Sequence, residues 1–191
     1  MPLGRSTDRA QHTSRRSAKN RRIGYFVGDV FQLGDLRRTI IITFMVNDAT
    51  STWGGGTARQ AARIFPSAQR EFCRIVSDDP DALVLGAVTL IAVGKRTYLA
   101  PLVAQRGYGR SAVPRIRYKA LRTAMTRLAS LATQLRAIVR MPRLGCGGAG
   151  GRWERVAAVV ERVVVPRTEV QVFDIVARRR RSEPARSDAA E

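Results

Sequence analysis

Apolar residues along this chain fall into short runs and longer amphipathic stretches, and the two patterns alternate. Residues 39–46 form a continuous run rich in β-branched side chains (TIIITFMV), which is typical of a strand buried on both faces. Two runs on either side of Gly94 and Lys95, at 87–93 and 97–104, indicate a pair of strands. Further short apolar runs predict three more strands, at 25–30, 137–141 and 169–175.

Apolar side chains spaced three or four residues apart predict amphipathic helices between these strands. The first helix follows the glycines at 54–56, and Pro66 breaks or restarts it. The apolar faces consist of Ala58, Ala62 and Phe65 in the first helix, Tyr118, Leu121, Met125, Leu128 and Leu135 in the second, and Trp153, Val156, Val160 and Val163 in the third. Strands separated by helices predict an α/β protein, a three-layer α/β/α sandwich with a central mixed β-sheet.

The charge balance changes the picture of possible partners. The chain has 191 residues with 34 Lys and Arg against 15 Asp and Glu, a net charge of +19. Such a balance favours a polyanionic partner, such as nucleic acid or a phosphorylated ligand, although GC-rich coding alone also enriches arginine. Residues 1–22 and 177–191 lack hydrophobic periodicity and are predicted to be disordered basic tails. One domain over 23–176 remains, long enough for a hydrophobic core.

Signals for membranes, metals and common catalytic groups are missing from the sequence. No apolar run approaches the roughly 20 residues of a membrane span, and the basic N-terminus lacks the apolar stretch of a secretory signal. A cytoplasmic protein without membrane contact is therefore expected. Cys73 and Cys146 fit no metal-ligand spacing, and the single histidine, His12, lies in the N-terminal tail. We predict no metal site, no cofactor and no Ser-His-Asp triad.

Two glycine-rich segments follow predicted strands and precede predicted helices. The stretch at 141–153 reads MPRLGCGGAGGRW, and the stretch at 53–57 reads WGGGT. At a helix N-terminus, unpaired backbone N–H groups and the helix dipole favour an anion, and glycines let a phosphate approach the backbone. Ligands of α/β sheets bind beyond the carboxyl ends of the strands. Two such loops suggest one ligand with two contacts, such as a nucleotide diphosphate; a plain turn is the alternative.

Two common nucleotide-binding patterns fit these loops poorly. Residues 145–150 (GCGGAG) formally match the dinucleotide pattern G-x-G-x-x-G, and Asp174 lies near the expected distance for the ribose-binding acid. That pattern normally opens a domain, whereas only one helix and one strand follow it here. A phosphate-loop NTPase is excluded because no lysine and Ser/Thr pair follows the glycines.

Four motifs together resemble the macro domains, a family that binds ADP-ribose. In chain order they are VGDVF, VNDA, WGGGTARQAARIFP and MPRLGCGGAGGRWERV, and the resemblance covers about Ile23 to Ile175. Each motif alone is weak, but four in the right order make the resemblance specific. The subgroup that the chain resembles contains the terminal ADP-ribose protein glycohydrolase and bacterial relatives with W-G-G-G.

The resemblance implies an ADP-ribose site. Asp29 would accept a hydrogen bond from the adenine amino group, with Val30 lining the same pocket, and Asn47 would face the distal ribose. Asp29 as a turn residue and Asn47 as a strand cap are the alternatives. The first loop, which would border the distal ribose and its phosphate, consists of Gly54, Gly55, Gly56 and Thr57. The second, which would wrap the diphosphate, consists of Gly145, Cys146, Gly147, Gly148, Ala149, Gly150, Gly151 and Arg152.

The catalytic residues of the subgroup do not carry over. Its lysine falls near Ala104 or Gln105, its aspartate falls at Ala149, and Arg152 stands where relatives often have a further aspartate. Arginine stays protonated and is a poor general base. Cys146, close to a helix start, is a candidate for a lowered pKa, but no base is recognisable beside it. The catalytic residues therefore remain unknown.

Three functions stay open, of which the sequence favours the first, ADP-ribose binding with hydrolysis, and leaves the other two as alternatives. The first is hydrolysis of ADP-ribosyl linkages on proteins or nucleic acid by a water that the ligand positions, as in other macro-domain hydrolases. The second is recognition of ADP-ribose, or of an ADP-ribosylated macromolecule, without catalysis. The third is a nucleic-acid-binding protein driven by its basic tails.

Overall fold

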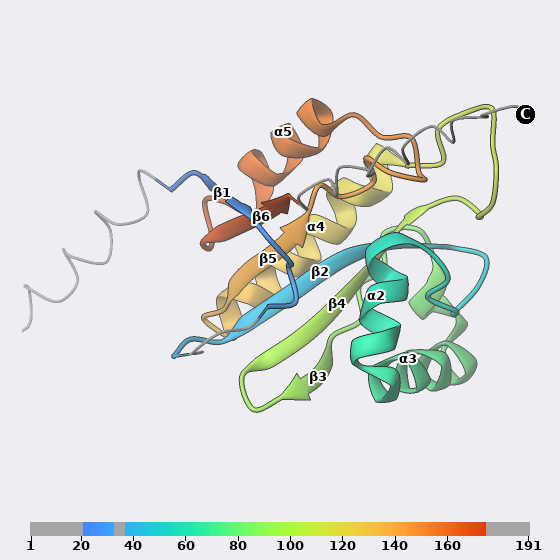
Figure 1. Cartoon of the computed structure of the whole chain (residues 1–191), viewed down its shortest axis with the longest axis horizontal. Coiled ribbons are helices and arrows are strands. Elements are labelled where there is room, and N and C mark those ends of the chain that lie inside the picture. The colour runs from blue at the N-terminus through green and yellow to red at the C-terminus, as the bar shows by residue number, and fades with distance from the viewer. Residues whose placement is uncertain (1–20, 33–36, 175–191) are drawn as a thin grey trace, which may run out of the picture.

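Six strands form one sheet in the order β1-β6-β5-β2-β4-β3 in a computed structural model of the chain, which describes residues 21–32 and 37–174 (Figure 1). The neighbours from β1 to β4 run parallel, and β3 alone pairs antiparallel with β4. The strands are β1 Ile23–Val27, β2 Ile40–Asn47, β3 Ile91–Gly94, β4 Thr97–Gln105, β5 Ile138–Pro142 and β6 Val170–Asp174. The predicted mixed sheet is confirmed.

The helices connect the strands and cover both faces of the sheet. They are α2 Gly56–Ile64, α3 Pro66–Asp78, α4 Tyr118–Gln134 and α5 Trp153–Val163, with a short 3₁₀ helix at Pro80–Leu83. In Figure 1, α2 and α3 lie on one side of the sheet, and α4 and α5 lie on the other. The three-layer α/β/α prediction is therefore confirmed.

The central strand β2 explains why the sheet is stable. Its β-branched run is buried along almost its whole length, because helices cover both of its faces. Ile41 belongs to the core under α4 and α5, and Phe44 to the core under α2 and α3. The one hydroxyl in β2, Thr43 Oγ1, donates to the carbonyl of Ala100 at 2.7 Å, so burial leaves it satisfied.

The strand boundaries differ from the sequence prediction mainly at two places. The predicted strand at 87–93 is wrong over its first half, because Gly86 adopts a φ of 98° and only an isolated bridge joins Val88 to Leu102. The predicted strand at 25–30 ends at Val27, because Gly28 has a φ of 148° and Asp29 Oδ1 accepts a hydrogen bond from Phe31 N at 2.9 Å. Pro66 restarts the helix rather than ending it, since it occupies the first turn of α3.

The described residues bear on only part of the predicted domain organisation. Apart from Arg21 and Arg22, the two predicted tails lie outside the described residues, so the boundaries at 23 and 176 stay predictions. Within residues 21–32 and 37–174, no helix is both long and apolar enough to cross a bilayer.

Candidate functional site

A cavity of about 620 Å³ opens at the carboxyl ends of the parallel strands β2, β4 and β5. Three segments that lie far apart in the sequence form its walls: the end of β2 with the loop into α2, the end of β4 with the loop after it, and the end of β5 with the second glycine loop. The lining residues are Met45, Val46, Asn47, Thr50, Thr52, Trp53, Gly54, Gly55, Gly56, Thr57, Ala58, Gln105, Tyr108, Gly109, Pro142, Arg143, Leu144, Gly145, Gly147, Gly148 and Ala149. Both predicted glycine loops therefore face one cavity.

The first glycine loop is anchored by a buried tryptophan. The Trp53 ring packs against Phe44 and Phe72, with ring centroids 5.0 and 5.5 Å apart. Its backbone N–H donates to Gln69 Oε1 at 2.8 Å, and Gln69 Nε2 donates to the carbonyl of Ser51 at 2.9 Å. The loop before α2 is therefore held by its neighbours on α3.

The glycines that follow Trp53 leave the start of α2 uncovered. A Cβ built on Gly54, Gly55 or Gly56 would meet no atom within 4 Å. Gly55 is the N-cap residue and provides no side-chain cap, so the first backbone N–H groups of α2 have no side-chain acceptor. Such groups at a helix N-terminus favour an anion, and this one lines the cavity.

The second glycine loop divides its glycines between two tasks. Gly145 and Gly150 adopt φ values of 69° and 68°, which favour glycine, and they bend the loop back on itself. The N–H of Gly151 donates to the carbonyl of Gly145 at 2.7 Å and closes the turn. Gly147 and Gly148 instead have open space where a side chain would start, and both line the cavity.

Asn47 and Asp48 shape the wall at the end of β2. Asn47 Oδ1 accepts hydrogen bonds from the N–H groups of Ala49 and Thr50 at 2.9 and 3.0 Å, which turns the chain away from the strand. Asp48 Oδ1 accepts a bond from the Gly107 N–H at 2.7 Å and ties this turn to the loop after β4. Asn47 thus lines the cavity and also has the structural role given as its alternative.

Asp29 and Val30 lie outside the cavity lining. Val30 is buried in the core under α2 and α3. Asp29 accepts from Phe31 N through one carboxylate oxygen and from Gln60 Nε2 through the other, the latter at 2.6 Å. Asp29 therefore joins the turn after β1 to α2, close to the helix whose first turn lines the cavity.

Four other predicted residues also lie outside the lining, namely Cys146, Gly150, Gly151 and Arg152. Arg152 is the N-cap residue of α5, and its backbone N–H donates to the Tyr118 hydroxyl at 2.9 Å. Its side chain is 77% exposed, with Nε 3.8 Å from Glu154 Oε2. Burial raises the pKa of the Cys146 thiol, an effect that Arg143 opposes and Glu154 reinforces. The suggestion of a lowered pKa at Cys146 is therefore wrong.

The raised pKa gives a direct test of thiol reactivity. We expect Cys146 to react with iodoacetamide more slowly in the folded protein than after unfolding in urea, because less of it is thiolate at any neutral pH. The rate at Cys146 should be followed by mass spectrometry across pH, with Cys73→Ser as the background. If the alkylation rate at Cys146 reached half of its maximum at a lower pH in the folded protein than in the unfolded one, this expectation would be contradicted.

Sequence reasoning missed Arg143, although it lies in the quoted glycine stretch. Its guanidinium pairs with both carboxylate oxygens of Asp174 at 2.6 and 2.7 Å, and it lies against the rings of Tyr25 and Trp153, 5.9 and 5.5 Å from their centroids. These hydrogen bonds hold the pKa of Asp174 below its usual range. Asp174 is thus a partner of a cavity residue, and no signal in the sequence pointed to the pair.

Tyr108, in the loop after β4, was also missed. It lines the cavity and is 64% exposed. Arg115 holds this loop in place, because its guanidinium donates to the carbonyls of Gly109, Arg106 and Arg110 at 3.0–3.2 Å. No sequence pattern marked the loop, since it has neither an apolar period nor a glycine run.

The cavity offers dipoles and shape more than acid–base groups. Among its lining residues, all of them in the described part of the chain, only Tyr108 and Arg143 are ionisable beyond the backbone. Across residues 21–32 and 37–174, no three His, Cys, Asp or Glu side chains gather closely enough to hold a metal ion. The site is suited to holding an anionic ligand with both apolar and hydrogen-bonding parts.

Comparison with known proteins places the fold. No family model and no curated protein matches the chain. A protein of unknown function from Bacteroides thetaiotaomicron superposes with a TM-score of 0.73 and 27% identity over 81% of this chain and 98% of that one. A macrodomain protein from Streptomyces coelicolor superposes with a TM-score of 0.68 and 29% identity, over 80% of this chain and 98% of that one. Thermosipho africanus DarTG in complex with ADP-ribose superposes with a TM-score of 0.66 and 18% identity, over 84% of this chain and 43% of that one. The chain has the macrodomain fold.

Proposed function

We propose that the chain binds ADP-ribose in the cavity at the carboxyl ends of β2, β4 and β5. The observation that carries this proposal is that two glycine loops and the N-terminus of α2 converge on one space of about 620 Å³. That volume is within the usual range of small-molecule sites. The fold shared with the Streptomyces macrodomain protein, and the ADP-ribose bound to Thermosipho DarTG, support the choice of ligand.

The diphosphate would lie between the two glycine loops. Gly147 and Gly148 leave room on one side, and Gly54 and Gly55 leave room on the other, so phosphate oxygens could approach backbone N–H groups from both. The first turn of α2 adds its dipole, which favours negative charge. The Arg143 guanidinium on the cavity wall adds positive charge, although its pair with Asp174 offsets part of it.

The two ends of the ligand follow from this placement. The distal ribose would lie beside Asn47 and the 54–57 loop, and the adenine would lie toward Asp29. Each carboxylate oxygen of Asp29 already accepts one hydrogen bond and keeps a second lone pair for the adenine amino group. Cys146, Gly150, Gly151 and Arg152 would support the loop rather than contact the ligand. The likeness of W-G-G-G to the terminal ADP-ribose protein glycohydrolase subgroup belongs to the same proposal.

We further propose that the chain recognises ADP-ribose without hydrolysing it. General acid–base catalysis needs a titratable side chain within hydrogen-bond reach of the reacting group. The cavity lining provides no Asp, Glu, His or Lys, and the subgroup's lysine and aspartate would fall near Ala104 or Gln105 and at Ala149. The Asp48 carboxylate, next to Asn47 in the chain, accepts from the Gly107 N–H, and the Asp174 carboxylate pairs with Arg143.

Calorimetry with free ADP-ribose tests the proposal. We expect ADP-ribose to bind at least about 10-fold more tightly than adenosine, because only ADP-ribose brings a diphosphate to the two loops, and charged hydrogen bonds are each worth about 1.5–3 kcal/mol. Equal affinities would contradict the diphosphate placement. In a parallel assay, ADP-ribosylated protein or DNA incubated with the chain should release no ADP-ribose. Release with turnover would contradict the proposal that the chain does not hydrolyse ADP-ribose linkages, but it would not contradict the proposed binding site.

A further inference from the structure

The sheet carries a row of basic side chains at the edge opposite the cavity. All five parallel strands begin at this edge, and each is preceded within three residues by arginine or lysine. We call these residues the basic edge: Arg21 and Arg22 before β1, Arg37 and Arg38 before β2, Lys95 and Arg96 before β4, Arg136 before β5, and Arg167 before β6. All eight are exposed.

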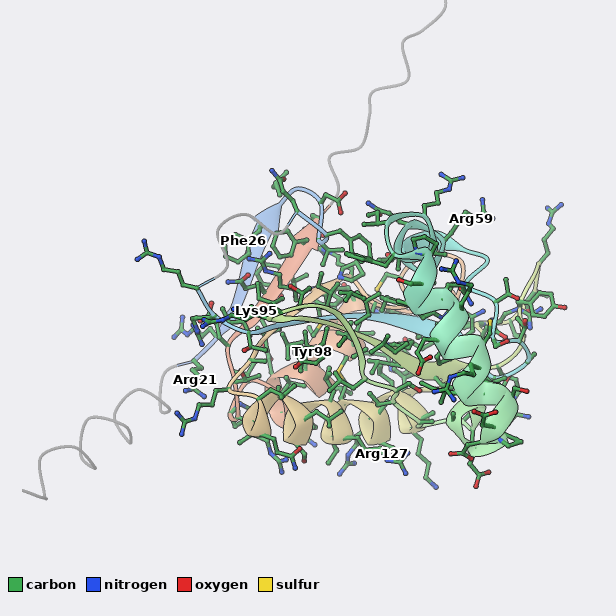
Figure 2. All side chains as sticks on the ribbon, turned by 90° about the horizontal axis from the view of Figure 1, so that it is seen from below. Arg21, Phe26, Arg59, Lys95, Tyr98 and Arg127 are labelled. Atoms are coloured by element: carbon green, nitrogen blue, oxygen red, sulfur yellow. The ribbon has the colours of Figure 1, made fainter. Side chains whose placement is uncertain are left out.

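Backbone contacts place these segments side by side. The N–H of Ile40 donates to the carbonyl of Arg96 at 2.8 Å, the N–H of Ile138 donates to Thr39, and the N–H of Val139 donates to Glu169. Neighbouring strands lie about 4.8 Å apart, so five of them spread the cations over about 19 Å. In Figure 2, Arg21 and Lys95 lie at one end of the ribbon, whereas Arg59 of α2 lies toward the other. The basic edge is thus an extended row.

Few of the described residues along this row carry negative charge. Among the described residues that lead into the five strands, Glu169 is the only acid, and it pairs with Arg38 at 2.7 Å. Arg167 donates to Ser130 Oγ, and Arg96 donates to the carbonyl of Arg37. Arg21, Arg22, Lys95 and Arg136 make no side-chain hydrogen bond or ion pair with the described residues. Acids gather elsewhere, at Glu71, Asp78, Asp79 and Asp81 in α3 and the 3₁₀ helix.

We propose that the basic edge binds the phosphate backbone of a nucleic acid. A linear row of exposed cations fits a polymer with regularly spaced phosphates, and duplex DNA presents one charge per about 1.7 Å of its axis. Arginine predominates in the row, and its planar fork suits phosphate oxygens. An anionic membrane is a weaker fit, because none of the exposed large apolar side chains of the described chain lies in these five segments.

Two consequences follow from the position of the row. The cavity lies at the carboxyl ends of the same strands, so a nucleic acid on the basic edge would leave the ADP-ribose site open. The sequence before Arg21 adds five basic residues and one acid, joined directly to this edge. The inference does not depend on the proposed ADP-ribose binding.

A matched pair of variants tests the proposal in the full-length chain. The edge variant combines Arg21→Gln, Arg22→Gln, Lys95→Gln and Arg136→Gln, which removes four cations without breaking a described side-chain bond. The control combines Arg63→Gln, Arg70→Gln, Arg122→Gln and Arg162→Gln, which are exposed, free of described side-chain bonds and distributed over α2, α3, α4 and α5. Both lose the same net charge, so only the position of the charges differs.

The readout is fluorescence anisotropy with a labelled 20-base-pair DNA duplex, titrated at several salt concentrations. We expect the edge variant to bind at least about 10-fold more weakly than the control, and its slope of log affinity against log salt to fall by up to about 3.6. Affinity for ADP-ribose, measured on the same samples, should not change. If the unchanged chain bound no ADP-ribose, that result would overturn the proposed function but would not affect the proposal that the basic edge binds nucleic acid.

Three results would overturn the basic-edge proposal. The first is an equal loss in both variants, which would mean that overall charge drives binding. The second is the absence of duplex binding in the unchanged chain at about 50 mM salt, where phosphate contacts are strong. The third is edge-dependent binding to vesicles of phosphatidylserine and phosphatidylcholine without binding to DNA, which would assign the row to a membrane surface.

Discussion

Valine at position 147 should abolish ADP-ribose binding while the domain stays folded. Gly147 lines the cavity, and a Cβ built on it would meet no protein atom within 4 Å, so the protein has room for the side chain. Its φ lies outside the left-handed region, so a β-branched residue adds no strain of that kind. The branched methyls would instead fill the space that we assign to the diphosphate. We expect affinity to fall by at least about 100-fold, or about 2.8 kcal/mol.

Calorimetry on Gly147→Val, with thermal unfolding alongside, measures both parts of this expectation. The midpoint should shift by no more than a few degrees, since surface substitutions are usually worth less than about 0.5 kcal/mol. Gly94→Val is a matched control, because Gly94 lies in β3 outside the cavity lining and its Cβ would make only ordinary contacts at 3.7 Å. Normal ADP-ribose binding by a folded Gly147→Val protein would move the diphosphate away from this loop.

Hydrophobic periodicity predicted the elements that the core defines most strongly. The β2 run and the α4 face were readable because almost every apolar residue in them is buried, so the pattern records the packing directly. The 87–93 run failed for the converse reason. Its apolar residues pack beside the sheet, but after the turn at Gly86, with its φ of 98°, Val88 forms only an isolated bridge with Leu102, and the regular ladder begins at Ile91. Side-chain pattern alone does not reveal whether the backbone groups of such a segment are paired.

The sequence predicted that the two glycine loops converge on one cavity, but not which side chains line it or contact one another. Parallel strands bring their carboxyl ends to one edge, and for this reason the two glycine stretches could be placed together from their order alone. Arg143 and Tyr108 were not predictable, because their positions depend on Asp174 and on the loop that Arg115 holds. Asp29 shows the same limit, since its contact with Gln60 comes from packing between distant segments.

The sequence shows the cations of the basic edge but not their arrangement. Each cation precedes an apolar strand and was visible in the sequence as part of a general excess of arginine. Only the strand order places these residues in one row, because β1, β6, β5, β2 and β4 are neighbours in space but not along the chain. A net charge therefore indicates a class of partner, whereas topology indicates where that partner would bind.

Gly145→Ala should destabilise the domain, in contrast to the Gly147 change two residues on. Gly145 has a φ of 69°, and its Cβ would lie 2.7 Å from Ile116 Cδ1 and 3.0 Å from Met45 Cε. The left-handed backbone costs a residue with a Cβ about 1–2 kcal/mol. Moving two side-chain ends in a packed region adds about 1 kcal/mol. We expect the free energy of unfolding, measured in urea, to fall by about 2–3 kcal/mol.

Gly148→Ala completes the comparison because it adds the same methyl group within the same loop. Gly148 has a φ outside the left-handed region and open space at its Cβ, so alanine there meets neither penalty. Its unfolding free energy should stay level or rise by up to about 1 kcal/mol, since alanine lowers the entropy of the unfolded chain relative to glycine. Equal losses of stability in the two alanine variants would contradict the distinction between Gly145, which forms the bend, and Gly147 and Gly148, which have open space at their Cβ positions. A loss confined to Gly145→Ala would show that the bend at Gly145 requires glycine for folding, whereas the position of Gly148 does not.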